Sequence, residues 1–430
     1  MDPELKSAND APWRPPISLV VQVAVFAGLL GCVAYLSFAR ADLIKTSAEE
    51  FDAGTEAKLT LAFLALFINY CTLVLHPGNR FQGMTGRWML ALFAPAALVA
   101  LVTPPFLSRD VFGYLVDASN IVHFGCNPFL EPMGAAAQNP WLQEIGPVWW
   151  THLTAAYGPT FYLILLPFVV RLTHTILVPV YLFKLFNAAV FGASVFACDR
   201  ILRAEGLGRR ATVLFALNPS VVIHVVGEAH NDGLIILLIL LAIWAMLAGK
   251  WTRSALALAI ATGIKFIAPL LLPIVVFDGK VRWRRILGSV AIVAGVFVVC
   301  AAPFGMPFRE IAAGLRYRQT LPAPSPLLYA PVPTIAAMDA VFGVHAQAAR
   351  TAALGLVYLL AAYFCILRRQ RRIEFVFWVL LAIAFLTTRW FMPWYPLTAI
   401  AVGCLLTGRT GYGAMVLVLT GYSLLHYFRV

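Results

Sequence analysis

The chain consists mostly of long apolar runs separated by short polar connections. A helix needs about 20 apolar residues to cross the hydrocarbon core of a bilayer, because each residue advances the helix by about 1.5 Å. Runs near this length recur along the whole chain and predict an all-α, polytopic membrane protein with about 11 full transmembrane helices. The predicted spans cover residues 17–38, 59–75, 88–104, 176–199, 211–227, 233–248, 285–303, 350–367, 374–388, 395–408 and 411–427.

The composition agrees with this pattern. Hydrophobic residues make up 61% of the 430 residues and charged residues only 12%, whereas ordinary globular chains have about 45–50% and about 25%. A soluble surface cannot be built from so few charges, so we expect a single transmembrane domain over residues 1–430. The net charge of +12 would indicate nucleic acid in a soluble protein, but here the charges lie in short loops, and no nucleic-acid partner is expected.

The positions of lysine and arginine predict the orientation of the chain. Cytoplasmic loops carry an excess of these residues, and an N-terminus on the inside places every basic cluster between spans in the cytoplasm. We therefore predict a multi-pass protein of the cytoplasmic (inner) membrane with its N-terminus inside. The long connections then face the extracytoplasmic side, where loops can supply an active site. They are residues 39–58, 105–158, 304–349 and 389–394.

Two runs depart from a plain series of spans. Residues 159–202 are long enough for two spans, but they join an outer loop to a basic inner turn, so we expect a short interfacial or re-entrant helix over 159–172 followed by one span. The run 254–277 has basic residues on both sides and is interrupted by Gly263 and two prolines, which predicts a re-entrant pair of half-helices. Irregular backbone at membrane depth is tolerated only against protein or a wet cavity, so this pair should line a cavity.

The first outer loop begins with residues suited to acid–base chemistry. Asp110 lies just beyond a predicted span and beside Arg109. Tyr114 and Asp117 follow four and seven residues later, so the three side chains would share one face of a short helix. A carboxylate at this place suits proton transfer. Capping of that helix, with Arg109 as an ion-pair partner, is the simpler interpretation and is favoured on this feature alone.

A second polar cluster occupies the tight outer turn at residues 228–233. Ionisable residues at such a turn are costly unless they are paired or used. Turn chemistry explains Asn231 and Gly233, and it leaves Glu228 and His230 without a reason. A functional role for this turn, which also contains Asp232, is therefore as well supported as a capped hairpin.

A lone lysine lies at the apex of the predicted half-helix pair. Lys265 is about a dozen residues from either basic flank, or roughly 18 Å of helix, which is too deep for comfortable snorkelling. No carboxylate is near it in the sequence, so an anionic ligand is the best explanation. A lipid-linked phosphate is the obvious anion inside a bilayer.

Arginines and aromatic rings recur on the predicted outer side. Arginine there runs against the positive-inside bias, and its guanidinium group can bind a phosphate with two hydrogen bonds. Aromatic belts explain each ring singly, but rings beside arginines can also stack on a sugar. The residues concerned are Arg316, Arg318 and His345 in loop 304–349, Arg389, Trp394 and Tyr395 in the later turn, and Tyr157 where the first outer loop re-enters the membrane.

Together these motifs resemble those of the GT-C integral-membrane glycosyltransferases, in particular the bacterial polyprenyl-phospho-mannose-dependent mannosyltransferases of glycosyltransferase family 87. The similarity extends over residues 88–408, and the order and predicted sidedness of the motifs carry it. The motifs lie at residues 108–114, 127–129, 157–159, 227–233, 263–265 and 393–395.

The resemblance implies a GT-C fold and an enzyme that transfers one sugar, mannose, from a polyprenyl phosphate. The acceptor would be lipid-linked or a glycan, and transfer would invert the anomeric carbon on the extracytoplasmic face. Asp110 occupies the position of the family's general base. Asp117, rather than an acid adjacent to Asp110, is the second carboxylate, which leaves a requirement for a divalent cation open; no metal ligand is assigned. A catalytic core module would cover about 88–250, and variable C-terminal helices about 251–430.

The remaining candidates are assigned by their chemistry. A departing phosphate gathers charge and is stabilised by preorganised cations. We assign it Lys265, Arg389, Arg316 and Arg318. Polar and aromatic residues of the same motifs are assigned to the sugar or the acceptor: Arg109, Tyr114, Asp117, Tyr157, His230, Asn231, Asp232, His345, Trp394 and Tyr395. Membrane lipids are the other expected partners.

Two other functions fit the same residues. A transporter or flippase of lipid-linked glycans would use the same cations without a base, although many transporters have internal repeats and none is evident in this sequence. A polymerase or ligase of lipid-linked glycans would differ in the size of its donor. The sequence contains no Walker motif, no HExxH and no CxxC, which removes support for nucleotide, zinc-peptidase and thiol-redox chemistry.

Overall fold

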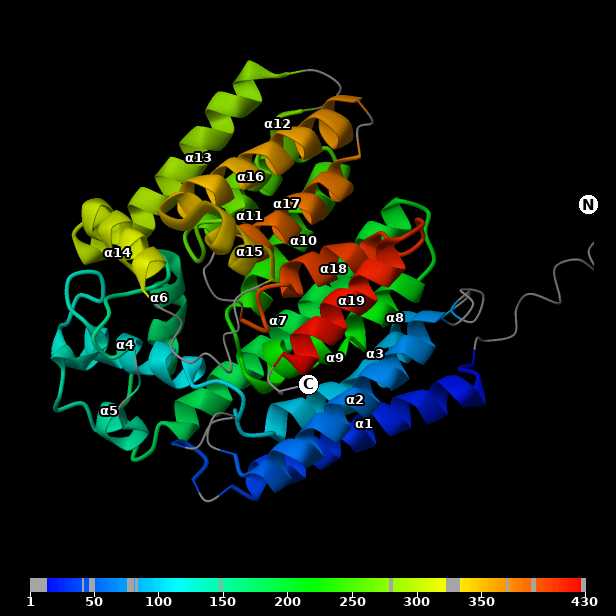
Figure 1. Ribbon diagram of the computed structural model, residues 1–430, viewed down its shortest axis with the longest axis horizontal. Helices are drawn as coiled ribbons and strands as arrows, with labels where there is room; N and C mark the ends of the chain where they lie inside the picture. The colour runs from blue at the N-terminus through cyan, green and yellow to red at the C-terminus, as the bar shows by residue number, and fades with distance from the viewer. Residues whose placement is uncertain are drawn as a thin grey trace, which may run out of the picture.

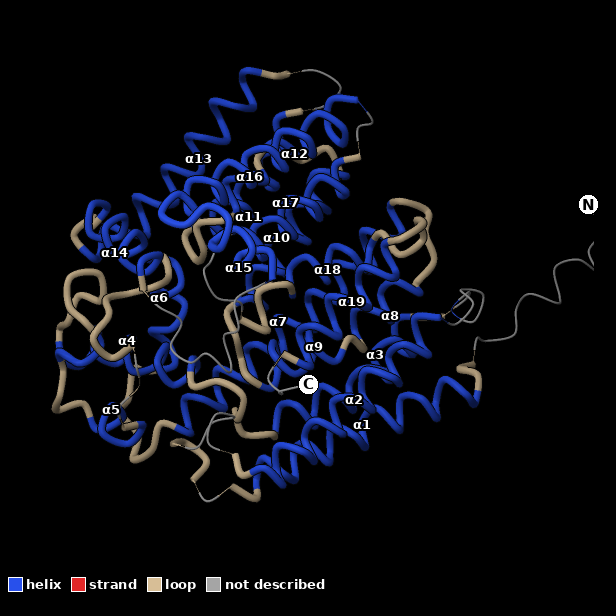
Figure 2. Tube along the Cα trace, viewed as in Figure 1, coloured by secondary structure: helices blue, strands red, loops and turns tan. Residues whose placement is uncertain are grey.

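Every regular element among the described residues is a helix in the computed structural model of the protein (Figure 1, Figure 2). The predicted all-α fold is therefore confirmed. The structure describes residues 14–40, 42–45, 51–75, 81, 84–146, 148, 150–277, 281–321, 333–368, 371–387 and 392–426.

The first three helices form a bundle that the last helix of the chain joins. α1 (Ile17–Phe38) packs against α2 (Ala53–Leu75) and α3 (Gly86–Val102). α19 (Tyr412–Leu425) packs against α2, and Figure 1 shows the red C-terminal helix beside the blue N-terminal ones. The two ends of the folded chain thus stabilise each other.

The centre of the molecule is built around one apolar helix. α10 (Asp232–Leu247) packs between α7 (Leu177–Ala204) and α11 (Trp251–Thr262), and α11 also packs against α13 (Trp283–Ala301). A bent stretch leads from α7 to α10, and its break falls at Asn218-Pro219, where the Asn218 side chain accepts the backbone N–H of Val221 and caps the second piece. The pieces are α8 (Arg210–Ala216), α9 (Pro219–Val221) and η6 (Val222–Gly227).

Four short helices gather at one end of the molecule. They come from the two longest predicted loops and from the segment after the first of these, and Figure 1 shows them together at its left edge. They are α4 (Asp110–Phe124), α5 (Pro140–Ile145), α6 (Pro159–Leu165) and α14 (Phe308–Thr320). Because loop segments far apart in sequence meet there, this end can bring their side chains to one site.

The C-terminal helices pack beside the central ones. α16 packs on α17, and α17 on α18, which in turn contacts α8, α10 and α19. The elements are α15 (Pro333–Phe342), η9 (Gly343–His345), α16 (Ala346–Ala361), η10 (Ala362–Arg368), α17 (Arg372–Leu386) and α18 (Leu397–Leu405).

Five helical stretches of the described residues are long and apolar enough to cross a membrane, and the bent stretch over 210–227 makes a sixth if its two parts form one span. Each predicted span range contains helix, but several helices are shorter than expected. Side chains such as Leu61, Leu287 and Leu359 are more than 60% exposed on these helices, as expected of surfaces that face lipid. The multi-pass membrane character is therefore confirmed, and the count of about 11 spans stays a prediction.

The two irregular runs are irregular in the structure as well. Residues 159–168 form the short α6 and η5 (Leu166–Phe168) ahead of the long α7, as predicted. The run 254–277 breaks after Gly263 and resumes as η7 (Ala268–Leu271) and α12 (Pro273–Val276), both of which contact α11. The break gives Lys265 a position outside any regular helix.

Candidate active site

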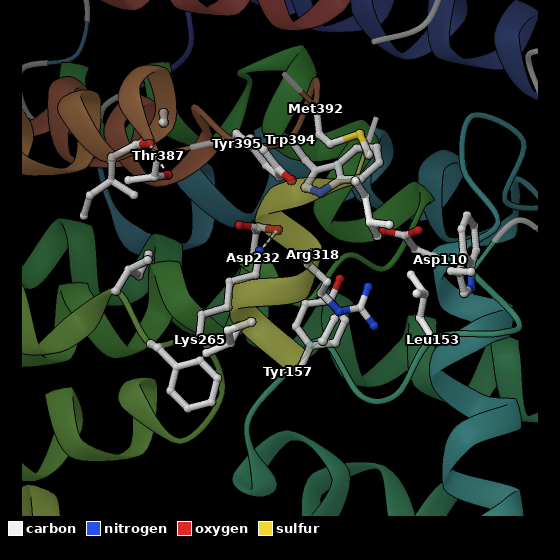
Figure 3. Close-up of a pocket in the computed structure, with 18 of the residues that line it drawn as sticks. Asp110, Leu153, Tyr157, Asp232, Lys265, Arg318, Thr387, Met392, Trp394 and Tyr395 are labelled. Carbon is white, nitrogen blue, oxygen red and sulfur yellow. Dashed lines mark hydrogen bonds and ion pairs between the residues drawn. The ribbon is translucent and has the colours of Figure 1, made fainter. Parts of the chain in front are cut away.

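A cavity of about 570 Å³ opens where the α4 end of the molecule meets the break after α11 (Figure 3). Segments far apart in sequence line it, and its charged side chains come from α4, α14, α16, the start of α10 and the broken run. Asp110, Lys265 and Trp394 all face this one space.

Asp110 is the first residue of α4. Its backbone N–H donates to Ser108 Oγ at 3.1 Å, and its carboxylate accepts the Tyr114 hydroxyl at 3.3 Å. That hydroxyl lies 3.1 Å from the hydroxyl of Tyr157. Asp110, Tyr114 and Asp117 all line the cavity, so the predicted shared face of a short helix is confirmed. Arg109 precedes the helix without a side-chain capping bond and donates to the carbonyl of Ile145.

Both carboxyl groups of α4 hold protons more tightly than usual. Burial raises the pKa of Asp110 to about 6, against the opposing effects of the Tyr114 hydrogen bond and the Lys265 charge. Burial raises the pKa of Asp117 to about 7, against the charge of Arg318 and the hydrogen bond from Tyr162. Either group could therefore exchange a proton near neutral pH.

Lys265 has a carboxylate partner that the sequence reasoning did not foresee. Its Nζ donates to Asp232 Oδ2 at 2.7 Å, across 33 residues of sequence, and lies 5.9 Å from the ring centre of Tyr157. The absence of a carboxylate near Lys265 in the sequence therefore did not leave it unpaired, because the fold brings the start of α10 to the break after α11. An ammonium group has three donors, so the pair with Asp232 leaves others for a ligand in the cavity.

Two glycine motifs dock backbone to backbone at the cavity wall. The N–H of Gly158 donates to the carbonyl of Ile264, and that of Thr160 to the carbonyl of Gly263, both at 2.9 Å. A Cβ at Gly158 would lie 2.4 Å from the Gly263 oxygen, and a Cβ at Gly263 would lie 1.9 Å from Thr160 Oγ1. Only glycine permits this approach, which sets Tyr157 beside Lys265.

Replacing Gly158 with alanine is expected to destabilise the protein by about 1–3 kcal/mol, because the added methyl group overpacks the contact. The same methyl group should also move Tyr157 and Lys265 apart. The thermal midpoint of detergent-purified protein measures the first effect. Gly192→Ala in α7 is the matched control, because a Cβ there has no neighbour within 4 Å. Equal midpoints for the two variants would contradict the tight docking.

Comparison with known protein families adds to this geometry. A family model described as "Glycosyltransferase family 87" matches residues 155–418, and one described as "Alpha-(1->6)-mannopyranosyltransferase, N-terminal domain" matches residues 18–278. The chain belongs to glycosyltransferase family 87. The resemblance stated from the motifs is thus confirmed.

Curated relatives of this family 87 chain carry related names. It is 28% identical over 179 residues to alpha-(1->6)-mannopyranosyltransferase A of Mycobacterium tuberculosis, covering 41% of this chain and 34% of the relative. It is 25% identical over 211 residues to the protein of the same name of Corynebacterium glutamicum, covering 48% and 41%. The chain thus spans less than half the length of these relatives. No solved structure shows a significant match.

The turn ahead of α10 borders the site in this family 87 chain. The ring of His230 is fully buried and stacks on Trp394, with ring centres 3.9 Å apart, and its Nδ1 lies 3.6 Å from Asp110 Oδ2. Asn231 is also fully buried. Of the turn's residues only Asp232 lines the cavity, so His230 contacts Asp110 from behind the cavity wall.

The other assigned residues divide into those at the cavity and those away from it. Arg318 lines the cavity, as do Trp394 and Tyr395. Arg316 is exposed, because two residues along α14 turn the side chain about 200° from Arg318. His345 is exposed ahead of α16, and neither it nor Arg109 is part of the cavity lining formed by the described residues. Arg389 lies outside the described residues.

The structure also reveals residues that the sequence reasoning missed. Arg350 lines the cavity from α16, is 6% exposed and pairs with Asp339 of α15. Arg350 is the first residue of the predicted span 350–367, and an arginine at that position could have indicated a functional residue. Lys184, in the middle of a predicted span, is fully buried, and the depth argument applied to Lys265 would have identified it. In the described part of the chain, no group of three or more His, Cys, Asp or Glu side chains could hold a metal ion.

Proposed function

We propose that the protein transfers one mannose, with inversion, from a polyprenyl-phosphate donor to a lipid-linked or glycan acceptor. Membership of family 87 supports glycosyl transfer, and the names of the relatives support mannose. The observation that carries the proposal is that Asp110 and Lys265 open onto the same cavity. A base and a cation on opposite parts of one space are what this transfer requires.

The cavity suits a donor with a polar head and an apolar tail. Polar side chains gather around Asp110, Asp232 and Lys265, whereas α17, together with Leu354 of α16, contributes an apolar wall. That wall includes Leu354, Leu380, Ile383 and Ala384. An isoprenoid chain buries its surface favourably against such side chains, at about 0.8 kcal/mol per buried methylene group. Together the two parts fit a lipid-linked sugar phosphate.

The chemistry follows from these positions. Asp110 accepts the proton of the acceptor hydroxyl as its oxygen attacks the anomeric carbon from the side opposite the phosphate. The bond between that carbon and the phosphate oxygen breaks, and the polyprenyl phosphate leaves with the bonding electrons. Lys265 and Arg318 stabilise the charge that gathers on the phosphate, while the ring of Trp394 can stack on the sugar. A positioned carboxylate base contributes about 10²–10⁴-fold to such a reaction.

The reaction is proposed for the extracytoplasmic face. The basic clusters between the predicted spans favour an N-terminus inside, which places the end with α4, α5, α6 and α14 outside. A single cysteine introduced at exposed Glu131, in a variant without native cysteines, should react with an impermeant thiol reagent added from outside. Labelling only from the inside would contradict the proposed face.

The function is tested with purified protein and polyprenyl-phosphate carrying radiolabelled mannose, offered to a panel of glycan and lipid-linked acceptors. We expect label in an acceptor product whose new linkage has the inverted anomeric configuration. Movement of intact donor across a vesicle membrane without transfer would favour a flippase. Transfer of a whole glycan rather than one sugar would favour a polymerase or ligase.

The pH dependence of transfer should report Asp110. Because burial raises its pKa to about 6, the carboxyl group stays protonated below that pH and cannot act as a base. We therefore expect kcat/KM to rise as the pH increases through about 6. The charged or titratable groups that interact with Asp110 are Lys265, Asp232, His230, Tyr114 and Tyr157. The measurement is kcat/KM for the donor against pH, with saturating acceptor. A value that falls as the pH increases through this range would contradict the assignment of Asp110 as the base.

A further inference from the structure

The loop that delivers Asp110 is held over residues 103–108 by buried and half-buried side chains. Residues 103–109 connect α3 to α4, and each of the first six has a backbone group hydrogen-bonded to a side chain from another part of the fold. The side chains belong to the end of α1, to α7 and to the turn after η6. A connecting loop usually keeps its backbone groups in water or in local turns, so this arrangement calls for an explanation.

Glu228 holds the half of the loop nearest the base. Its carboxylate is 1% exposed and accepts three successive backbone N–H groups, from Phe106 at 3.0 Å, Leu107 at 3.2 Å and Ser108 at 3.1 Å. The hydroxyl of Ser108 in turn accepts the N–H of Asp110. Glu228 is therefore linked to the proposed base through one residue, and it does not line the cavity formed by the described residues.

Lys184 and the end of α1 hold the other half. The Lys184 ammonium group is fully buried and donates to the carbonyls of Ala100 at 3.1 Å, Gly227 at 2.5 Å and Thr103. The Ser37 hydroxyl donates to the Pro104 carbonyl, and the Arg40 guanidinium to the Pro105 carbonyl, both at 3.0 Å. We refer to Glu228, Lys184, Ser37 and Arg40 together as the clamp. Because Lys184 binds the carbonyl of Gly227, the residue next to Glu228, the positive and negative side chains of the clamp meet at one turn.

That turn also orients the rest of the site. Glu228 holds the loop before Asp110, His230 lies against Asp110 itself, and Asp232 pairs with Lys265. One short segment thus sets the proposed base and the proposed phosphate-binding cation relative to each other. An ion pair such as that of Asp232 and Lys265 contributes little to stability compared with apolar packing, but it can specify one arrangement of the two side chains.

We propose, on the basis of the proposed role of Asp110, that Glu228 and Lys184 are positioning residues that fix the catalytic aspartate at the cavity. Neither touches the donor or the acceptor. Their effect on transfer is through the geometry of residues 103–110, where a misplacement of about 1 Å can lower a rate by about 10²-fold.

The test compares Glu228→Gln and Lys184→Met with Asp110→Asn in purified protein, with polyprenyl-phospho-mannose as donor. Glu131→Gln is the matched control, because Glu131 also accepts a backbone N–H but is exposed and lies outside the clamp. We expect Glu228→Gln to lower kcat by about 10²-fold with little change in the donor KM. The acid limb of the pH profile should move from about 6 toward about 4, because a loosened loop lets water reach Asp110. A variant that only lowered the amount of folded enzyme would not move that limb.

Hydrogen exchange gives a readout that does not need activity. The N–H groups of residues 106–108 should exchange slowly in the wild-type protein and much faster in Glu228→Gln, while Glu131→Gln leaves them slow. If Glu228→Gln does not fold, Arg40→Met at the accessible edge of the clamp replaces it and should show a smaller change of the same kind.

The outcomes separate this inference from the proposed function. If Asp110→Asn loses transfer while Glu228→Gln keeps the wild-type kcat, acid limb and exchange rates, the positioning role is overturned and the function stands. If Asp110→Asn stays fully active, the base assignment fails, and the positioning role fails with it. Loss of kcat, a lowered acid limb and faster exchange in Glu228→Gln together support the clamp.

Discussion

Replacing Asp110 with asparagine is expected to lower turnover by about 10²–10⁴-fold, which is the usual contribution of a positioned general base. Asparagine keeps the size of the side chain and can still accept the hydrogen bond from Tyr114, so the cavity should retain its shape. Donor affinity should therefore stay near the wild-type value. The measurement is kcat for mannose transfer, together with equilibrium binding of polyprenyl-phospho-mannose.

Asp42→Asn is the control for this substitution. Asp42 lies in the loop after α1, where it accepts the N–H groups of Ile44 and Lys45, away from the cavity lining formed by the described residues. It should keep wild-type turnover. A fully active Asp110→Asn enzyme would contradict the proposed mechanism, and so would a loss of activity explained entirely by lost donor binding.

The second large effect is expected from Lys265→Met. The substitution removes the cation nearest the proposed phosphate, and a hydrogen bond to a charged group is worth about 1.5–3 kcal/mol. Donor affinity should fall by about 10- to 100-fold, which calorimetry can measure. The single variant should also lose stability, because it leaves Asp232 without its ion-pair partner.

The double variant Lys265→Met/Asp232→Asn separates these two effects. It removes both charges, so the thermal midpoint should recover toward wild type while donor affinity stays low. Recovery of affinity in the double variant would show that Lys265 acts only as the partner of Asp232. Such a result would remove the lysine from the proposed donor site.

The sequence predicted those features that depend on local periodicity. Apolar runs indicated where the helices lie, and α1 has the predicted bounds. The spacing of Asp110, Tyr114 and Asp117 predicted their common face, because helical geometry relates residues four and seven apart. Gly263 and two prolines predicted the break that leaves Lys265 at the cavity.

Features that depend on tertiary contact could not be predicted in this way. The partner of Lys265 is Asp232, on a different helix, and no sequence period relates the two. The sequence offered no explanation for the glutamate at position 228, because its partners are backbone N–H groups more than a hundred residues earlier. Arg316 and Arg318 looked equivalent until the register of α14 separated them.

The most direct test is an experimental structure of Asp110→Asn protein with polyprenyl-phospho-mannose bound. We predict that the donor phosphate lies within hydrogen-bonding distance of Lys265 Nζ. The anomeric carbon should face residue 110, and the isoprenoid chain should run along α16 and α17. A donor bound with its phosphate away from Lys265, or with its sugar in a space that residue 110 does not reach, would contradict the proposal.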